Sequence, residues 1–394
     1  MLALLAALLA FGLLENRRHQ RGLEAIPLRI HVNGTRGKSS VTRLIAAGLR
    51  AGGRRTIAKT TGTSPMLILE DGRQQRIRRA GRANIIEQVQ VVKIAAERGA
   101  QALVIECMAL LPELQWLSEH RMIRSTVGVL TNAREDHFDV MGPTAAHVAR
   151  SLCNTVPSRG VLFTADERFL AIFKEAAALN STEVVLADAA DVADEEMHPF
   201  GYIEHRENVA LALKVCQAQG VSREKALAGM YGCIPDPGVL RLYKVQYFDK
   251  QIDFVNAFAA NDRESTLLIL ERLRALLGKD RKVIVLFNTR GDRIQRAEQF
   301  AGMIAHDIKA DLFILLGEFV DAVEASAVRQ GAPADKILNL GPLRREEIPH
   351  LFEAVLHATV SRAIVVGIGN IGGIGQAIVD FFENRARGPV SHAR

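Results

Sequence analysis

The segment from His31 to Ser40 restricts the fold of this chain more than any other part of the sequence. It follows a short apolar run, Leu28 to Val32, and precedes a stretch with helical periodicity, so we expect a strand, a tight loop and a helix in that order. The loop itself reads Gly34-Thr35-Arg36-Gly37-Lys38-Ser39-Ser40. This pattern is typical of a phosphate-binding loop at the edge of a parallel sheet.

Each residue type in the loop has a physical role in binding a triphosphate. The glycines let backbone N–H groups close around phosphate oxygens, and the N-terminus of the following helix adds a partial positive charge. Lys38 is expected to reach the terminal phosphates and Ser39 to ligate magnesium. Val32 stands where the general pattern has its first glycine. We predict a site for ATP and Mg²⁺ formed by Gly34, Thr35, Arg36, Gly37, Lys38, Ser39 and Ser40.

Three further polar segments follow predicted strands and should meet the loop at the same sheet edge. Thr63 and Ser64 lie in a turn after one strand, and Glu106 ends another. A single glutamate at a strand end more often faces solvent, but its carboxylate also suits Mg²⁺. The third segment, Asn132 to Asp139, contains an asparagine, two aspartates and a histidine within eight residues, a density that favours a functional site.

These motifs, in this order, resemble those of the Mur-ligase superfamily, the ATP-dependent amide ligases that include the peptidoglycan Mur enzymes and folylpolyglutamate synthase. The shared positions are Gly34–Ser39, Thr63–Pro65, Glu106 and Thr131–Gly142. Longer strings are similar to the ATP-binding ligase subunit of poly-γ-glutamate synthases, a branch of this superfamily. These strings are Lys59–Thr63, Glu106–Ala109, Asp139–Thr144, Pro235–Gly238, Phe258–Asp262 and Gly367–Ile371.

The resemblance implies an α/β fold in which a P-loop domain with a mostly parallel sheet, like the Mur-ligase central domain, precedes a smaller Rossmann-like α/β domain. The residues agree, because short apolar runs alternate with helical patterns along the chain. We predict buried strands at 28–32, 102–105, 127–130, 160–163, 184–186, 282–287, 312–316 and 363–367. A turn-rich stretch between the two sets places the domains at 25–250 and 251–390.

The resemblance also implies roles for single residues. Catalysis is assigned to Lys38, Glu106 and His137, and metal binding to Ser39, Glu106 and His137. Asn208 is similar to an asparagine on the adenine side of the family's site, and Arg241 to an arginine at the nucleotide. Mur ligases carry a lysine that holds a second metal after the motif histidine, whereas no lysine occurs here between His137 and Lys174. How a second metal would be held therefore stays open.

The implied reaction is amide formation. ATP converts the terminal carboxylate of a glutamyl chain into an acyl phosphate, which the amine of glutamate then attacks. Residues near the end of one C-terminal strand would bind the incoming carboxylate through arginine forks, although an ordinary surface ion pair explains them equally well. The candidate substrate residues are Thr63, Ser64, Asn288, Arg290, Asp292 and Arg293.

Other functions fit parts of the sequence. A regulatory P-loop ATPase without ligase chemistry needs only the loop, and a ligase like folylpolyglutamate synthase shares the motifs. Gly367, Gly369 and Gly372 mimic a dinucleotide-binding fingerprint, but too few residues follow them for the next βαβ unit. The resemblance to poly-γ-glutamate synthases is the interpretation we carry forward.

The N-terminus differs from the rest of the chain. Met1 to Leu14 is uninterrupted apolar sequence, and Arg17, Arg18 and Arg21 follow it. We expect residues 1–22 to be a retained hydrophobic helix that anchors the chain at the cytoplasmic face of a bacterial membrane. The run spans only roughly 21 Å as a helix, short of the ~30 Å hydrocarbon layer, so a buried or interfacial helix is the alternative.

Charge and cysteine usage narrow the partners. The net charge of +6 at pH 7 favours an anionic partner without choosing which. The four cysteines form no Cys-x-x-Cys pair, so the sequence suggests neither a zinc site nor a disulfide framework. The resemblance implies glutamate and poly-γ-glutamate as ligands and small membrane subunits as partners. A homo-oligomer stays open, and no nucleic-acid partner is expected.

Overall fold

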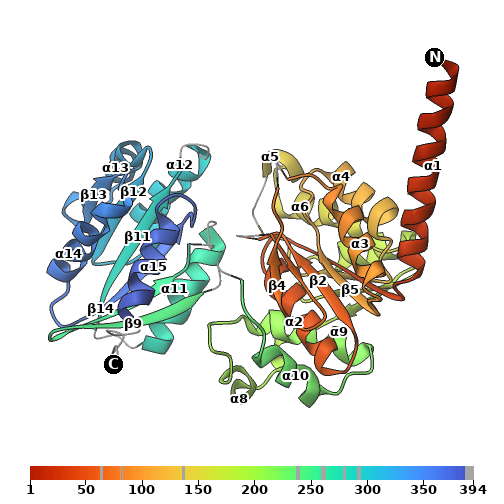
Figure 1. Cartoon of the computed structure of the whole chain (residues 1–394). Helices are drawn as coiled ribbons and strands as arrows, with labels where there is room; N and C mark the ends of the chain where they lie inside the picture. The colour runs from red at the N-terminus through yellow and green to blue at the C-terminus, as the bar shows by residue number, and fades with distance from the viewer. Residues whose placement is uncertain are drawn as a thin grey trace, which may run out of the picture. The chain divides into compact units, whose positions relative to one another are not determined.

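The computed structural model describes residues 1–62, 65–79, 81, 83–134, 138–236, 240–258, 263–277, 281–290 and 294–386. The chain divides into two compact units, Met1–Pro237 and Gly238–Arg394, each built around its own sheet (Figure 1). The two mostly parallel sheets, with helices between their strands, confirm the predicted mixed α/β class.

The first unit contains an eight-stranded sheet of order β4-β3-β2-β5-β1-β6-β7-β8. In this order the strands from β2 to β8 are parallel, and β3 and β4 add an antiparallel edge. The strands are β1 (Leu28–Asn33), β2 (Thr56–Thr60), β3 (Met66–Ile68), β4 (Gln74–Arg76), β5 (Ala102–Glu106), β6 (Val127–Leu130), β7 (Val161–Thr164) and β8 (Glu183–Leu186). All five strands predicted in this part of the chain are present, with ends within one residue or so of the expected ones.

Helices cover both faces of this sheet. They are α1 (Leu2–Glu24), α2 (Lys38–Ala51), α3 (Glu87–Glu97), α4 (Pro112–Leu117), α5 (Phe138–Met141), α6 (Ala145–Leu152), α7 (Leu170–Leu179), α8 (Asp194–Met197), α9 (Arg206–Ala218) and α10 (Arg223–Tyr231), with a π-helical turn at Ser118–Ile123. Ile30 and Val32 of β1 face the core formed with α2, α9 and α10. Leu103 and Ile105 of β5 point to the opposite face, where α3 and the end of α1 pack. The alternation follows the two-residue period of a strand.

The second unit contains a six-stranded sheet of order β13-β12-β11-β14-β10-β9, in which only β9 is antiparallel to its neighbour. Its strands are β9 (Arg241–Tyr247), β10 (Lys250–Asn256), β11 (Lys282–Thr289), β12 (Leu312–Gly317), β13 (Ile337–Gly341) and β14 (Arg362–Gly369). Its helices are α11 (Arg263–Leu277), α12 (Ile294–Gly302), α13 (Val320–Arg329), α14 (Ile348–Ala358) and α15 (Gly375–Ala386).

The expected division near residue 250 falls inside the β9–β10 hairpin, whereas the compact units divide between residues 237 and 238. β9 pairs antiparallel with β10, from Arg241 opposite Asn256 to Tyr247 opposite Lys250, and therefore belongs to the second sheet. The sequence prediction named no strand at 241–247, and composition alone does not say which sheet such a segment joins.

The N-terminal apolar run lies in α1, which projects from the first unit (Figure 1). Several of its large side chains are more than half exposed, among them Leu8 and Phe11 at 61% and 65%. The other end of α1 is fixed, because Leu23 and the following Ile26 are buried in the core. Within the described residues, none of the helices has both the length and the apolar character needed to cross a membrane.

Candidate active site

Three parallel strands end side by side at the centre of the first sheet. β1 lies between β5 and β6, and the register pairs Val32 with Glu106 and Asn33 with Leu130. The segments that follow these strands therefore begin at the same level of the sheet. This is the position at which open α/β sheets bind ligands, and the phosphate-binding loop occupies it.

Two glycines give the loop its shape. Gly34 and Gly37 both have positive φ, +135° and +82°, which side chains rarely adopt. A Cβ atom on Gly34 would lie 2.0 Å from the Thr131 hydroxyl oxygen, and one on Gly37 would lie 2.6 Å from the side-chain oxygen of Asn208. The backbone can close the loop only because both positions lack a side chain.

A Gly34→Ala variant should lose both stability and nucleotide affinity. The added methyl group would overlap Thr131, so we expect a destabilisation at least about 2 kcal/mol larger than that of a matched Gly72→Ala variant. Gly72 also has positive φ, but a Cβ atom there would have nothing within 4 Å, so Gly72→Ala reports backbone strain alone. Denaturant unfolding and calorimetric ATP titration measure the two effects. Equal unfolding midpoints and equal ATP affinities for the two variants would contradict this account.

The loop is held in place from the β6 side by Asn132. Its side-chain oxygen accepts hydrogen bonds from the Thr35 hydroxyl at 2.7 Å and from the Arg36 N–H at 3.1 Å, and its amide donates to the Arg36 carbonyl at 3.1 Å. The Lys38 ammonium donates to the carbonyls of Gly34 at 2.6 Å and Thr35 at 3.2 Å. Lys38 thus lies folded over the loop, where phosphate oxygens can replace those carbonyls.

Ser39 and Glu106 meet as predicted. The Ser39 hydroxyl donates to Glu106 Oε2 at 2.8 Å, and the Thr61 N–H donates to the same oxygen at 2.6 Å. The expectation that a lone glutamate faces solvent is wrong for Glu106, which is only 2% exposed, because the segment after β2 covers the end of β5. The burial of Glu106 is therefore determined by the tertiary fold and not by its local sequence.

This pair of oxygen groups fits Mg²⁺, which keeps several waters and takes one or two protein ligands beside phosphate oxygens. Within the described ranges, no three His, Cys, Asp or Glu side chains converge as a metal site of their own. The third predicted metal ligand, His137, lies outside the described residues. A magnesium site built from these described residues would need the triphosphate to complete it.

Asn208 supports the loop from the α9 side. Its oxygen faces Gly37, and its amide donates to Glu204 Oε1 at 2.8 Å. Burial raises the pKa of Glu204, and the hydrogen bond from Asn208 opposes that rise. Glu204 lies just before α9 and was not among the residues expected from the sequence. The predicted adenine-side role of Asn208 stays a prediction.

A buried ionic cluster next to Glu106 was also missed. Lys59 on β2 is fully buried, and its ammonium lies 2.9 Å from Glu87 Oε1 and 3.3 Å from the Gln88 side-chain oxygen. Arg79 forms a bidentate pair with the same Glu87, at 2.7 and 3.0 Å. Burial lowers the pKa of Lys59, while the Glu87 charge opposes that change. A lysine within a short segment between buried strands was the only available signal, and it is a weak one.

The remaining predicted residues fall into two groups. Thr63, Ser64, Asp292 and Arg293 lie outside the described residues. Arg241 opens β9 of the second unit. The Asn288 amide, on β11, donates to the carbonyls of Asn370 and Gly372, at 2.5 and 3.1 Å, so this part of Asn288 holds the turn after β14. Arg290 follows β11, with its guanidinium near Gly372. Substrate contacts of these residues stay predictions.

Comparisons with known proteins identify the family of this chain. The family description "Mur ligase middle domain" matches residues 32–231, and "Poly-gamma-glutamate synthase CapB C-terminal domain" matches residues 242–385. The Bacillus subtilis (strain 168) protein named PGA synthase CapB is 37% identical over 377 residues, which cover 95% of each chain. The chain belongs to the CapB family. Its resemblance to Mur ligases and to poly-γ-glutamate synthases is thereby confirmed.

Two further comparisons define what CapB-family membership adds. The Bacillus anthracis capsule biosynthesis protein CapB is 39% identical over 375 residues, covering 95% of this chain and 80% of that protein. The structure of Mycobacterium tuberculosis folylpolyglutamate synthase complexed with ADP and AMPPCP superposes with a TM-score of 0.67 at 18% identity, covering 96% of this chain and 98% of that one. At that identity the likeness shows a shared fold, and the CapB relatives carry the family assignment.

Proposed function

We propose that this CapB-family chain is an ATP-dependent ligase that joins glutamate to the terminal carboxylate of a glutamyl chain and so synthesises poly-γ-glutamate. The observation that carries the proposal is that Lys38, Ser39 and Glu106 lie together at one edge of the sheet. The chain that brings them together is similar to a PGA synthase along nearly its whole length. Nucleotide binding rests on the loop, and the choice of polymer rests on the relatives.

The chemistry explains why a phosphate-binding loop is needed. A carboxylate does not condense with an amine at neutral pH, because oxide is a poor leaving group. Transfer of the γ-phosphoryl group of ATP to the carboxylate gives an acyl phosphate and ADP. The amine of glutamate then forms the amide bond, phosphate leaves with the electron pair of the broken C–O bond, and the amine loses its proton to solvent or to a base.

The described residues provide positioning and positive charge for the first step. The Lys38 ammonium would exchange its bonds to the Gly34 and Thr35 carbonyls for terminal phosphate oxygens. Asn132 keeps the loop closed meanwhile. Ser39 and Glu106 would hold Mg²⁺, which when bound neutralises phosphate charge. The Thr61 N–H fixes the Glu106 carboxylate at the loop.

Other roles in the proposal rest on the family resemblance. His137 would support a second metal or the acyl phosphate, and Arg241 would contact the nucleotide. Thr63, Ser64, Asn288, Arg290, Asp292 and Arg293 would bind substrate carboxylates. We also propose that residues 1–22 attach the chain to the cytoplasmic face of the membrane, beside small membrane subunits of a synthase complex.

Release of ADP that depends on glutamate tests the function directly. We expect purified full-length protein, alone or with its membrane subunits, to release ADP and phosphate faster when glutamate and a short poly-γ-glutamate acceptor are present, with growth of the acceptor measured by mass spectrometry. ATP hydrolysis that no amino acid stimulates would indicate the regulatory ATPase instead. Stimulation by a folate acceptor and not by poly-γ-glutamate would indicate a ligase like folylpolyglutamate synthase.

A further inference from the structure

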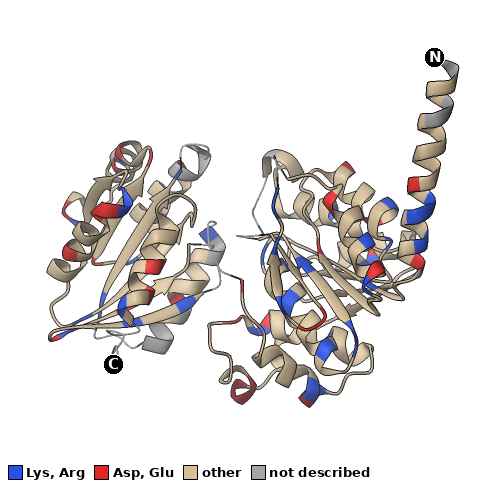
Figure 2. Ribbon diagram, viewed as in Figure 1, with Lys and Arg blue, Asp and Glu red and all other residues tan. Residues whose placement is uncertain are grey.

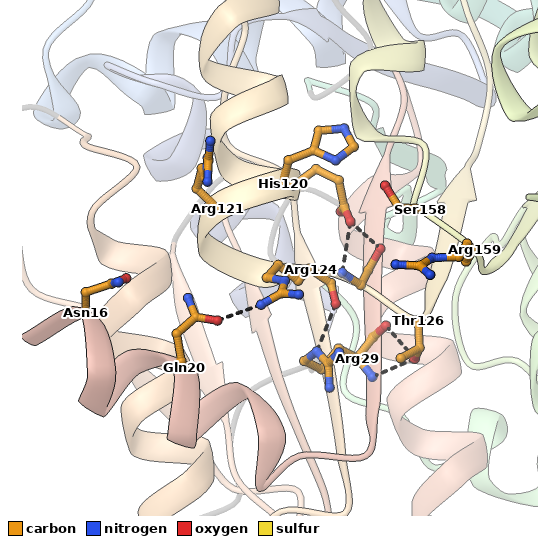
Figure 3. Close-up of a pocket in the computed structure, with 11 residues that line it drawn as sticks. Asn16, Gln20, Arg29, His120, Arg121, Arg124, Thr126, Ser158 and Arg159 are labelled. Carbon is orange, nitrogen blue, oxygen red and sulfur yellow. Dashed lines mark hydrogen bonds between the residues drawn. The ribbon is translucent and has the colours of Figure 1, made fainter. Parts of the chain in front are cut away.

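A second site lies at the edge of the first sheet opposite the phosphate-binding loop. It is a cavity of about 670 Å³ (Figure 3). Its wall includes Arg29 near the start of β1, Thr126 just before β6 and Arg159 just before β7, whereas the loop follows the strand ends. Asn16 and Gln20, four residues apart on α1, close one side. Neither the proposed reaction nor the predicted site residues use this cavity.

The cavity is strongly cationic. Arg29, Arg121, Arg124 and Arg159 line it, and Glu119 is the single carboxylate among its lining residues. The Glu119 carboxylate is buried, and its hydrogen bonds among the described residues go to His31 and Ser125 and not to the arginines, although its charge acts on Arg29. Its Oε2 lies 2.8 Å from His31 Nδ1, and its Oε1 accepts hydrogen bonds from the N–H and hydroxyl of Ser125 at 2.8 and 2.9 Å. In the described part of the chain, no acid forms an ion pair with Arg121, Arg124 or Arg159.

The local fold holds two of these arginines in an unusual conformation. Arg124 and Arg159 have φ of 48° and 56°, and they are two of the five non-glycine residues with positive φ in the described part of the chain. Such a backbone costs about 1–2 kcal/mol per residue and persists where the surroundings impose it. Arg124 is further held by Gln20 of α1, whose side-chain oxygen accepts from its guanidinium at 2.6 Å.

Arg29 has a different part in the cavity. Its guanidinium donates to the carbonyls of Ile123 and Arg124, at 3.2 and 2.9 Å, and to those of Leu23 and Ile26, at 3.0 and 2.6 Å. Arg29 therefore connects the end of α1 and the π-helical turn to β1. It is a structural part of the cavity wall and also contributes positive charge to it. Unlike the Arg29 guanidinium, the guanidinium groups of Arg121, Arg124 and Arg159 hold no backbone carbonyl in the described part of the chain, although Arg124 bonds to Gln20 and Arg121 lies over the Trp116 ring. These three arginines are the ones that a ligand can engage with least disturbance of the wall.

The helix that closes the cavity also carries the exposed apolar run. The first half of α1 bears no charged side chain, and Glu15, Arg17, Arg18, Arg21 and Glu24 lie in its second half (Figure 2). Gln20 at the cavity is only six positions after Leu14, which is roughly 9 Å along the helix. A bilayer that receives the apolar half of α1 thus brings its headgroups to the level of the arginines.

We propose that this cavity binds the phosphate group of an anionic lipid headgroup while the apolar half of α1 inserts into the same bilayer. Guanidinium groups bind phosphate oxygens as bidentate forks, which suits a site of several arginines without a free carboxylate. A soluble polycarboxylate matches the charge, but it leaves the exposed leucines beside the cavity without a partner. The inference rests on the proposed membrane attachment of residues 1–22 and adds its chemical selectivity.

The test compares lipid binding by full-length variants with equal net charge. One variant carries Arg121→Gln, Arg124→Gln and Arg159→Gln. The control carries Arg329→Gln, Arg345→Gln and Arg362→Gln, three exposed arginines of the second unit. With vesicles of phosphatidylcholine plus phosphatidylglycerol, we expect the cavity variant to bind at least about tenfold more weakly than the control, with no difference on phosphatidylcholine alone. Thermal unfolding and glutamate-dependent ADP release check that both variants are folded. If the triple variant is not folded, the single Arg159→Gln variant replaces it in the comparison.

A second titration separates the cavity from the helix. Monomeric short-chain phosphatidylglycerol should bind the control and a variant lacking residues 1–14, but not the cavity variant. If vesicles bind neither wild type nor control while the short-chain lipid still binds, membrane attachment fails and the cavity proposal stands. Equal binding of phosphatidylglycerol by cavity variant and control overturns the cavity proposal. The cavity proposal is also overturned if the cavity variant loses binding of poly-γ-glutamate but keeps binding of phosphatidylglycerol, because the polymer would then be the ligand.

Discussion

Replacing Lys38 by alanine is expected to lower glutamate-dependent ADP release by about 10³-fold or more. The ammonium of Lys38 lies over the loop, bonded to the Gly34 and Thr35 carbonyls, and can move from them onto the transferring phosphoryl group. Its charge is needed most when negative charge redistributes in the transition state, so kcat should fall more than ATP affinity. Steady-state kinetics and a calorimetric ATP titration measure these two quantities separately.

The matched control for this variant is Lys93→Ala. Lys93 is an exposed lysine of α3 that pairs loosely with Glu97, at 3.8 Å, and its replacement should leave activity unchanged. Because Lys38 is only partly buried, Lys38→Ala should unfold within a few degrees of wild type. A Lys38→Ala protein that is folded and retains most of its glutamate-dependent activity would remove the loop from the proposed chemistry.

The second large effect concerns pH and stability. The free energy of unfolding should fall by about 3 kcal/mol as the pH rises from 6.5 to 9. Burial by itself lowers the pKa of His31, but the nearby Cys107 and the hydrogen bond and charge of Glu119 raise it to about 9 in the folded protein. A histidine whose pKa is higher in the folded state than in the unfolded state contributes its full stabilisation at pH values below the unfolded-state pKa. This contribution is lost as the pH rises through the folded-state pKa.

A Glu119→Gln variant isolates this pair. The amide keeps the size of the side chain but removes the negative charge that stabilises protonated His31. The His31 ring is fully buried, and its Nδ1 lies 2.8 Å from Glu119 Oε2. We expect this variant to be less stable than wild type at pH 6.5 and to show a much flatter dependence on pH. Glu97→Gln, at an exposed position of α3, should keep the wild-type slope. Denaturant unfolding at several pH values supplies the comparison, and identical slopes for all three proteins would refute the assignment.

Elements with strong local signals were predictable. The loop from Gly34 to Ser40 could be located because glycine, lysine and serine at this spacing are typical of phosphate binding. The strands around it could be located because short apolar runs in an α/β chain usually form buried strands. The pairing of Ser39 with Glu106 was expected from the family resemblance, and the structure brings the two side chains together at 2.8 Å.

Contacts across the sequence were not predictable in the same way. Glu106 was expected to face solvent when considered alone, yet the segment after β2 buries it. The place of 241–247 in the second sheet depends on pairing with β10, and Glu204 and Lys59 acquire their importance from Asn208 and Glu87. Each case depends on which partner the fold brings near, and one residue's type does not contain that information.

By itself, then, the sequence determined the phosphate-binding loop, the α/β class and the family, because these depend on residue spacing along one stretch of chain. Only the tertiary structure decided how Asn132 and Asn208 close that loop, how Thr61 fixes Glu106, and that four arginines from three segments line one cavity at the other edge of the sheet. The physical reason is that hydrogen bonds, burial and local charge act between groups that are close in space, and the order of the strands sets those distances.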